Sequence, residues 1–170
     1  FAIYGLRGQP HILDGLIDAE KRGVRVRGII DKTIDGESYY KDTYLLEEKL
    51  SNIKSDYQSD LETLNDLKDK KKSENKKCER PTFTDGPLQC FEGKGYASKE
   101  EIIFSGDIMH NKFFIVDNRF IWTGSANISD TDIGGYNANV VAVLDSPFFA
   151  SFYQKEFDQM FIKGRHHRKK

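Results

Sequence analysis

The stretch from His110 to Asn127 reads HNKFFIVDNRFIWTGSAN and contains the pattern of a β-hairpin. Residue types alternate from Ile108 to Val116, which predicts a strand because successive side chains of a strand point to opposite faces. Residues 117–119 have the composition of a turn, and Phe120 to Trp122 would return as the second strand. One face of the first strand is then expected to carry His110, Lys112, Phe114 and Val116. The hairpin therefore places a histidine and a lysine side by side.

The polar residues of this stretch form a longer pattern than a hairpin needs. His110, Lys112 and Asp117 spell His-x-Lys-x4-Asp, which is a weak signal because this composition produces roughly 0.1 such occurrences by chance. Gly-Ser-x-Asn follows at residues 124–127, and the joint pattern has a chance expectation of roughly 10⁻⁵. The alternative is a histidine and a lysine exposed on an edge strand, with Ser-Ala-Asn as a helix cap. The rarity of the joint pattern favours a functional site.

These residue types can act together on an anion. A histidine and a lysine two apart on a strand project to the same side, so both can reach one phosphate group. Imidazole is a nucleophile near neutral pH, and a lysine ammonium stabilises the extra negative charge of a five-coordinate transition state. Ser125 and Asn127 add a hydroxyl and an amide donor, while Gly124 allows close backbone approach. No carboxylate cluster resembling a two-metal site accompanies the pattern in the sequence, so we expect neither a metal ion nor a cofactor.

Before the hairpin, the chain begins with the pattern of a strand, a helix and a second strand. Phe1 to Tyr4 has the composition of a strand, and Pro10 suits the first turn of a helix that ends before Gly23. The apolar face of this helix consists of Ile12, Leu13, Leu16 and Ile17. Val24 to Ile30 alternates as the second strand should. This order within about thirty residues predicts a parallel pair of strands with helices packed on the sheet.

After the hairpin come another strand pattern and an aromatic helix. Asn139 to Leu144 predicts a buried strand, and Ser146 with Pro147 predicts the beginning of a helix. The apolar face of that helix consists of Phe148, Phe149, Phe152, Tyr153, Phe157, Met160 and Phe161. We expect this face to belong to the hydrophobic core rather than to a cofactor site.

The middle of the chain differs from both flanks. From Tyr40 to Lys72, apolar residues recur every three or four positions among charged ones, which predicts one long amphipathic helix or a helical hairpin. Residues 68–77 then carry six lysines. We therefore predict that residues 36–100 form an insertion made of a helix and a basic loop. The lysine run is either a solvated loop or a nucleic-acid contact, and the candidate contact residues are Lys70, Lys71, Lys72, Lys76 and Lys77.

Length and composition limit the class of protein. The 170 residues predict a single domain, with residues 163–170 as a basic and flexible tail. The net charge of −1 excludes a uniformly basic, histone-like nucleic-acid binder, and no apolar run approaches the roughly 18 residues of a membrane span. Cys78 and Cys90 are too few for a disulfide-stapled scaffold, and one disulfide or two reduced thiols fit equally well.

The stretch from His110 to Asn127 resembles the HKD motif of the phospholipase D superfamily, His-x-Lys-x4-Asp-x6-Gly-Ser-x-Asn. The resemblance extends to residues 10–31 and 139–161, whereas residues 36–100 have no obvious counterpart. It implies an α/β sandwich in which a mixed β-sheet is flanked by helices. It also implies metal-independent hydrolysis of a phosphodiester through a covalent phosphohistidine intermediate.

The resemblance also implies a role for each residue of the motif. By position, His110 would be the nucleophile or its acid partner, and Lys112, Ser125 and Asn127 would hold the phosphate oxygens. Asp117 completes the catalytic motif, and it is expected to order the hairpin and neighbouring groups rather than to perform chemistry.

Two departures from the family pattern affect these expectations. The chain has one motif, and family members with one copy pair as homodimers in which two motifs meet at a shared site. We therefore expect a homodimer. Many members also have a glutamate where this chain has Ala138, and there it orients the imidazole. Asn137, Asn139 or another carboxylate would have to take that role.

The resemblance does not select the phosphodiester, because the superfamily contains several activities. Short members with one motif are most often nucleases, and the lysine run suits a polyanion, so we expect an endonuclease that cleaves DNA or RNA. The alternatives are a phospholipase D-type lipid phosphodiesterase and a non-catalytic nucleic-acid-binding relative. No exposed amphipathic segment rich in Trp, Phe or Leu is evident in the sequence, which argues against the lipid alternative.

Overall fold

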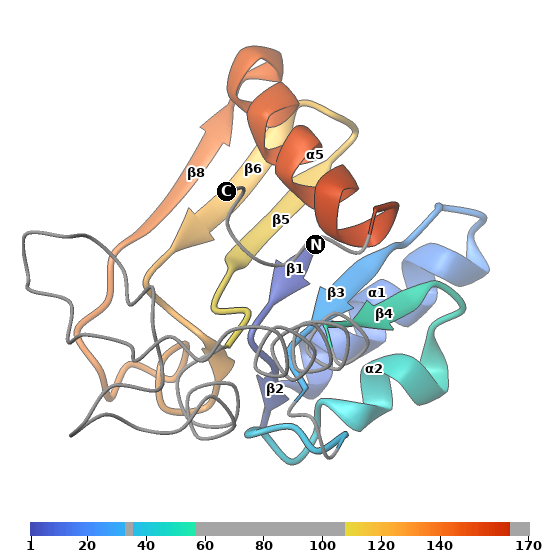
Figure 1. Cartoon of the computed structure of the whole chain (residues 1–170). Coiled ribbons are helices and arrows are strands. Elements are labelled where there is room, and N and C mark those ends of the chain that lie inside the picture. Colours follow the sequence, from blue (N-terminus) through green and yellow to red (C-terminus); the bar gives the residue numbers. More distant parts are fainter. Residues whose placement is uncertain (33–35, 57–107, 164–170) are drawn as a thin grey trace, which may run out of the picture.

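The computed structural model describes residues 1–32, 36–56 and 108–163 (Figure 1). The strands are β1 (Ala2–Ile3), β2 (Leu6–Arg7), β3 (Gly28–Ile30), β4 (Ile53–Ser55), β5 (Lys112–Val116), β6 (Phe120–Gly124), β7 (Ile128–Ser129) and β8 (Val141–Asp145). The helices are α1 (Pro10–Lys21), α2 (Tyr44–Lys49) and α5 (Pro147–Phe161). None of the helices within these ranges is long and apolar enough to cross a membrane.

Six of the described strands form one mixed sheet, in the order β4-β3-β1-β5-β6-β8. The first three are parallel to one another, and β5, β6 and β8 join as antiparallel neighbours. The remaining two strands, β2 and β7, pair in parallel beside the main sheet. The parallel pairing of β1 with β3 across α1 confirms the predicted strand-helix-strand unit.

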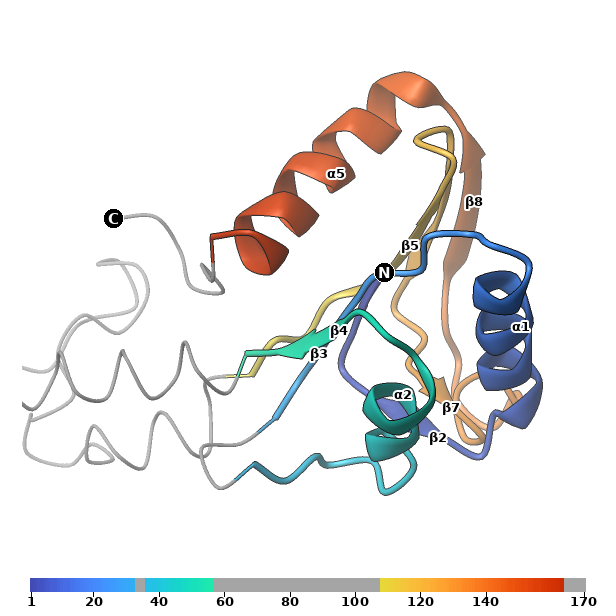
Figure 2. The same cartoon turned by 90° about the vertical axis from the view of Figure 1, so that its right-hand side faces the viewer.

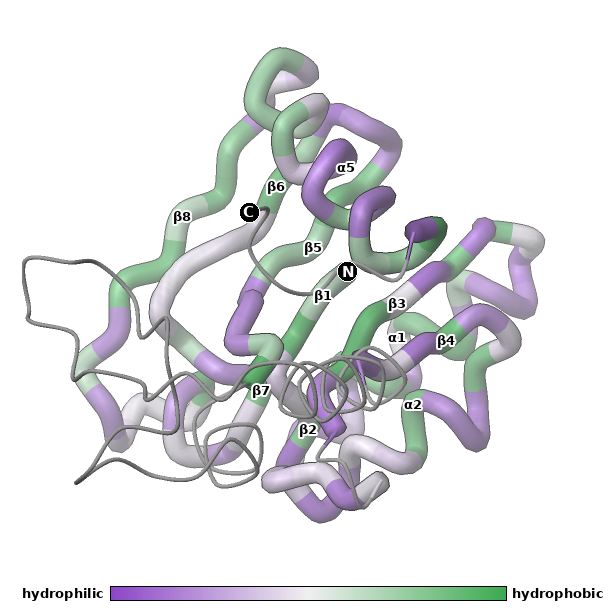
Figure 3. The backbone as a smooth tube through the Cα atoms, viewed as in Figure 1, coloured by the Kyte–Doolittle hydropathy of each residue, from purple (hydrophilic) through white to green (hydrophobic). Residues whose placement is uncertain are grey.

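Helices cover both faces of the large sheet. Figure 2 shows α5 on one side of the strands and α1 with α2 on the other. Phe113 contacts Tyr153 of α5 with ring centroids 5.1 Å apart, whereas its neighbour Phe114 contacts Phe1 on the opposite face at 5.3 Å. Figure 3 shows hydrophobic residues along the central strands. This arrangement confirms the predicted fold class, a mixed sheet flanked by helices.

The N-terminal unit agrees with the sequence except in the length of its second strand. Pro10 begins α1, and Gly23 follows the helix with a positive φ of 87°, which glycine adopts without strain. The predicted strand from Val24 to Ile30 is shorter, because only Gly28–Ile30 is in the sheet. The neighbouring strands β1 and β4 offer ladder partners from residue 28 onward, so residues 24–27 pass over the sheet edge as a loop.

The prediction of one long helix or a helical hairpin from Tyr40 to Lys72 is wrong for the described part, residues 40–56. The helix α2 ends at Lys49, Leu50 is extended, and Ile53–Ser55 pairs with β3 as the outer strand β4. Leu46 and Leu50 are buried against the same core as α1, with Ile53 packed beside them, so a short helix followed by a strand satisfies the same apolar spacing. The extent of the predicted insertion, residues 36–100, stays a prediction because most of it lies outside the described residues.

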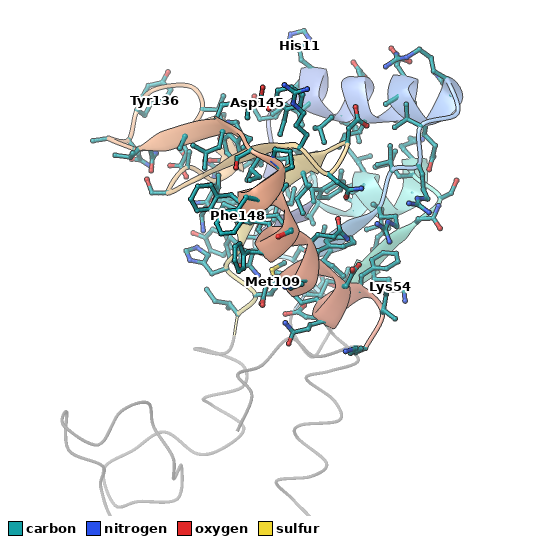
Figure 4. The ribbon with its side chains drawn as sticks, turned by 90° about the horizontal axis from the view of Figure 1, so that it is seen from above. His11, Lys54, Met109, Tyr136, Asp145 and Phe148 are labelled. Atoms are coloured by element: carbon teal, nitrogen blue, oxygen red, sulfur yellow. The ribbon has the colours of Figure 1, made fainter. Side chains whose placement is uncertain are left out.

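The C-terminal elements are more exposed than the sequence predicts. The strand β8 is at one end of the sheet among the described strands, and Val143 is 69% exposed rather than buried. Phe157 and Met160 belong to the core, as expected. Three phenylalanines in the N-terminal half of α5 do not, although Ala150 in the same half is buried. We call these exposed residues, Phe148, Phe149 and Phe152, the α5 aromatic face; Figure 4 labels Phe148.

Candidate active site

All of the motif residues except Asp117 lie toward one end of the strands of the large sheet. There β1 and β3 end, β5 begins and β6 ends (Figure 1). His110 lies just before β5, between two anchored neighbours. The backbone N–H of Met109 donates to the carboxylate of Asp31 at 2.6 Å, and the N–H of Tyr4 donates to the carbonyl of Asn111 at 3.1 Å. These bonds replace the strand pairing that the sequence predicts for residues 108–111.

His110 is exposed, and its ring meets the ring of Tyr4 edge to face at 4.9 Å. The pKa of His110 is below its ordinary value, because partial burial and the nearby charge of Lys112 both disfavour the imidazolium. Near neutral pH the imidazole is therefore mostly uncharged. That is the form with a free lone pair for nucleophilic attack.

Lys112 is buried, with 7% of its surface exposed, and its ammonium donates to the carbonyl of His110 at 3.1 Å. The sequence predicts the two side chains on one face of a strand, whereas in the structure His110 lies before β5 and the ammonium contacts its backbone carbonyl. Burial lowers the pKa of Lys112, while the negative charge of Asp132 acts in the opposite direction. An ammonium in such a place is weakly screened by water, which strengthens its interaction with an anion.

The Gly-Ser-x-Asn segment continues from the end of β6. The Ser125 hydroxyl donates to the Asn139 side-chain oxygen at 2.9 Å and accepts from the N–H of Val140 at 3.0 Å. A Cβ at Gly124 would lie 2.1 Å from the carbonyl oxygen of Val140, so only glycine fits there. Ser125 thus joins the end of β6 to the segment that precedes β8.

Asn127 leads to a carboxylate that sequence reasoning missed. Its N–H and its side-chain amide donate to one oxygen of Asp132, at 2.8 and 2.7 Å, and the Asn137 amide donates to the other oxygen. Burial would raise the pKa of Asp132, but these hydrogen bonds outweigh it and hold that pKa below the ordinary value. Asp132 therefore stays ionised in a buried position near Lys112.

Two buried side-chain atoms of this network lack a hydrogen bond within the described part of the chain. They are the side-chain oxygen of Asn127 and the side-chain nitrogen of Asn139. An unsatisfied buried polar atom costs about 1–3 kcal/mol, so such atoms are uncommon outside functional sites. The nitrogen of Asn139 is a donor near Asp132, and it helps to lower the pKa of that carboxylate.

Comparisons with known proteins agree with this fold. A family model described as the phospholipase D-like domain of cardiolipin synthase matches residues 1–161. The chain belongs to this family of phospholipase D-like domains. A search of curated proteins gives no match.

Two solved structures share the phospholipase D-like fold. NucT from Helicobacter pylori aligns with a TM-score of 0.55 and 20% identity, over 96% of this chain and 77% of that one. The phospholipase D family member Nuc from Salmonella typhimurium aligns with a TM-score of 0.56 and 20% identity, over 99% of this chain and 80% of that one.

The fold does not bring every residue of the phospholipase D-like motif to the site. Asp117 is in the hairpin turn with a positive φ of 54°, and the full length of β5 separates it from Lys112. Its position fits the expected role in ordering the hairpin and does not fit a catalytic one. The five lysines from Lys70 to Lys77 lie outside the described residues. Within the described ranges, no three His, Cys, Asp or Glu side chains are grouped as metal ligands.

Proposed function

We propose that the protein is a metal-independent phosphodiesterase, and specifically an endonuclease that cleaves DNA or RNA through a phosphohistidine intermediate. One observation carries the proposal. The buried ammonium of Lys112 donates to the backbone carbonyl of His110, and its charge acts on the exposed, mostly neutral imidazole of that residue. This pair combines a nucleophile with a stabiliser of negative charge at phosphorus.

In the proposed first step, a nitrogen of His110 attacks the phosphorus atom. A nitrogen–phosphorus bond forms, the bond to the leaving oxygen breaks, and a second histidine donates a proton to that oxygen. In the second step water attacks phosphorus, gives its proton to the second histidine, and releases His110. Lys112, with Ser125 and Asn127 of the motif, would hold the phosphate oxygens throughout.

Asp132 is a carboxylate bonded to Asn137, beside Ala138, where many relatives have a glutamate that orients the imidazole. It fixes Asn127 and Asn137, and its charge acts on Lys112 rather than on His110. We propose Asp132 as a positioning residue of the phosphate-binding side chains. The imidazole itself is held by the ring of Tyr4 and by the anchored backbone around it.

The second histidine would come from another copy of the chain. One motif supplies one His110, and a twofold axis would bring the same residue from each subunit to a common phosphate. The exposed strand β8 supports this proposal. Among the described strands it lies at one end of the sheet, it exposes Val141 and Val143, and Ser125 accepts the N–H of Val140 just before it.

A subunit-mixing experiment tests the shared site. Wild-type protein is mixed with His110→Ala protein until the subunits have exchanged, and x is the wild-type fraction. Only x² of the dimers have both histidines, so an equal mixture should retain about a quarter of the activity if pairing is random. A linear dependence on x, with exchange confirmed, would contradict the shared site, and so would an active monomer.

A lipid phosphodiesterase is the second candidate function, and one observation favours it. The α5 aromatic face exposes three phenylalanines, with ring centroids of Phe148 and Phe152 5.0 Å apart. An exposed aromatic face of a helix can insert into the headgroup region of a bilayer. The expectation that no such segment exists is therefore wrong.

A substrate panel decides between the candidates. Plasmid, single-stranded DNA, RNA and phosphatidylcholine vesicles are each incubated with the protein in EDTA. Cleavage of nucleic acid that survives EDTA supports the proposal, because attack by histidine needs no metal-activated water. Cleavage of lipid alone would select the second candidate. Complete loss with EDTA that Mg²⁺ reverses would contradict the mechanism, and no cleavage of any substrate would indicate a binding protein.

The lysine run is proposed as a nucleic-acid contact and has a test of its own. Changing Lys70, Lys71, Lys76 and Lys77 to glutamine should weaken binding and reduce its dependence on salt, because fewer counterions are released. Turnover at saturating substrate should change little. An unchanged salt dependence would show that the run is a solvated loop.

A further inference from the structure

Three tyrosines lie against one another beside His110. Tyr4 follows β1, while Tyr39 and Tyr40 belong to the loop before α2. The ring of Tyr39 is stacked on that of Tyr4, with centroids 5.7 Å apart and planes 29° apart. Tyr40 meets the rings of Tyr4 and Tyr39 edge to face at 5.5 and 5.1 Å. Because Tyr4 also contacts His110, the cluster extends directly from the proposed nucleophile.

The inner part of the cluster is held firmly. Tyr40 is buried, with 7% exposure, and its carbonyl accepts a hydrogen bond from the Thr43 hydroxyl at 2.7 Å. The same hydroxyl accepts the N–H of Leu6 at 2.9 Å, which ties the loop to β2. The guanidinium of Arg7 lies 5.3 Å from the ring centre of Tyr40. Burial, with the charge of Asp31, raises the pKa of Tyr4 to about 12, so its hydroxyl stays protonated.

Tyr39 differs from the other two because it is 71% exposed. The ring of Tyr39 is not part of the hydrophobic core. Its exposed surface would be more stable in contact with another apolar surface than in water. Its position is nevertheless set by the stacked ring of Tyr4 and the edge contact of Tyr40. An aromatic ring that is held in place with an open face is already organised to stack on a flat ligand.

We propose that Tyr39, supported by Tyr4, is a stacking platform for an unpaired base next to the phosphate that His110 attacks. The substrate class would then be single-stranded nucleic acid. In a duplex each base is already stacked between its neighbours, whereas a single strand can place a base on an aromatic ring. The inference rests on the proposed phosphodiesterase function and narrows its substrate.

A choline headgroup is the competing ligand for exposed tyrosines, and the geometry is less suited to it. A quaternary ammonium is bound by several ring faces that surround it. Here the guanidinium of Arg7 lies over Tyr40, and Tyr4 is in contact with three other rings. Tyr39 is the exposed member of the cluster, and one open face suits a planar base better than a surrounded cation.

The test compares Tyr39→Ala with wild type on a short oligothymidylate in which one linkage is a natural phosphodiester and the others are methylphosphonates. Stacking of one base is worth about tenfold in affinity or more, so KM should rise by about tenfold while kcat changes by less than about twofold. Tyr39→Phe keeps the ring and should keep KM. Tyr44→Ala, a change at another exposed tyrosine on α2, is the matched control and should have no effect.

A second substrate identifies the contact. When the base beside the cleavable linkage is removed, the KM of wild type should rise about as much as the KM of Tyr39→Ala rises on the intact strand. The KM of Tyr39→Ala on the strand without that base should be little higher again. Equal KM values for wild type and Tyr39→Ala on the intact strand would overturn the platform. A rise in KM confined to phosphatidylcholine vesicles would also overturn it in favour of the ammonium ligand.

Failure of the proposed function is distinguishable from failure of the platform. If the wild-type protein cleaves no nucleic acid, the phosphodiesterase proposal for nucleic acid is wrong. Fluorescence anisotropy with the same labelled strand then measures affinity without cleavage. Weaker binding by Tyr39→Ala, with Tyr44→Ala unchanged, would uphold the platform, and equal binding would overturn it.

Discussion

The two ends of the β5–β6 hairpin carry polar groups in opposite situations. At one end Lys112 is buried, and atoms of nearby Asn127 and Asn139 lack hydrogen bonds within the described residues. At the other end Arg119 forms two hydrogen bonds with Asp145 at 2.5 and 2.7 Å, and both side chains are about half exposed. The charge of Lys112 at the first end is therefore weakly screened by water. At the second end the charges of Arg119 and Asp145 offset each other, and water screens both.

The difference separates two roles within one sequence motif. Some of the groups that we propose to act on an anion are left partly unsatisfied, which costs stability and is tolerated at functional sites. Groups that order the chain are paired or placed in a turn, as Asp117 is. Substitutions at the two ends should therefore affect different quantities: activity at the first end, and the free energy of unfolding at the second.

The largest effect is expected for Lys112→Met. The methionine fills a similar volume without the charge, so the transition state loses its stabilising ammonium and kcat should fall by about 10²- to 10³-fold. The protein should remain folded, because the change removes a charge from a buried place. Single-turnover kinetics and circular dichroism measure the two quantities. A loss of less than tenfold in a folded variant would remove Lys112 from the chemistry.

A smaller loss of activity is expected for Asp132→Asn. The new amide group cannot accept both sets of hydrogen bonds from Asn127 and Asn137, so the phosphate-binding side chains move and kcat should fall by about 10- to 100-fold. The matched control is Asp130→Asn, which changes an exposed neighbour paired with Arg7. Steady-state kinetics of both variants decide the matter, since equal effects would show that Asp132 has no special role.

At the opposite end, Asp117→Val should change stability and not kcat. A β-branched residue is strained at a φ of 54°, so the free energy of unfolding should fall by about 1–2 kcal/mol. Asp117→Asn is the control, because asparagine tolerates this conformation. Urea denaturation measures the stability of each variant, and kcat is compared for the folded protein. A drop in kcat for both variants would return Asp117 to the catalytic group.

The smallest effect is expected for Asp145→Asn. The pKa of Asp145 is lowered chiefly by its hydrogen bond from Arg119, but both groups are exposed and water screens the pair. The free energy of unfolding should fall only slightly, and less again at high salt. Urea denaturation at two salt concentrations tests this. A large decrease in the free energy of unfolding that salt does not reduce would contradict the contrast between the two ends of the hairpin, because the Arg119–Asp145 pair would then be poorly screened as well.

Local patterns in the sequence were sufficient for much of the fold and for part of the site. The hairpin, the parallel unit around α1 and the start of α5 follow from alternation, capping residues and glycine, which act over a few neighbouring positions. The proximity of His110 and Lys112 is equally local. The spacing of the motif therefore identified the residues that form the proposed chemical centre.

Contacts between distant segments were decided by packing. The 3–4 spacing that predicted a helix through Ile53 also fits α2 followed by β4, and only the space beside β3 selects the strand. The burial of β8 and of the first half of α5 depends on which faces the sheet leaves uncovered. Asp132 and Tyr39 belong to no motif. Asp132 reaches the site because it follows β7, and Tyr39 reaches it because it is in the loop between β3 and α2. A short pattern contains no information about such meetings, because they depend on the whole arrangement of the chain in space.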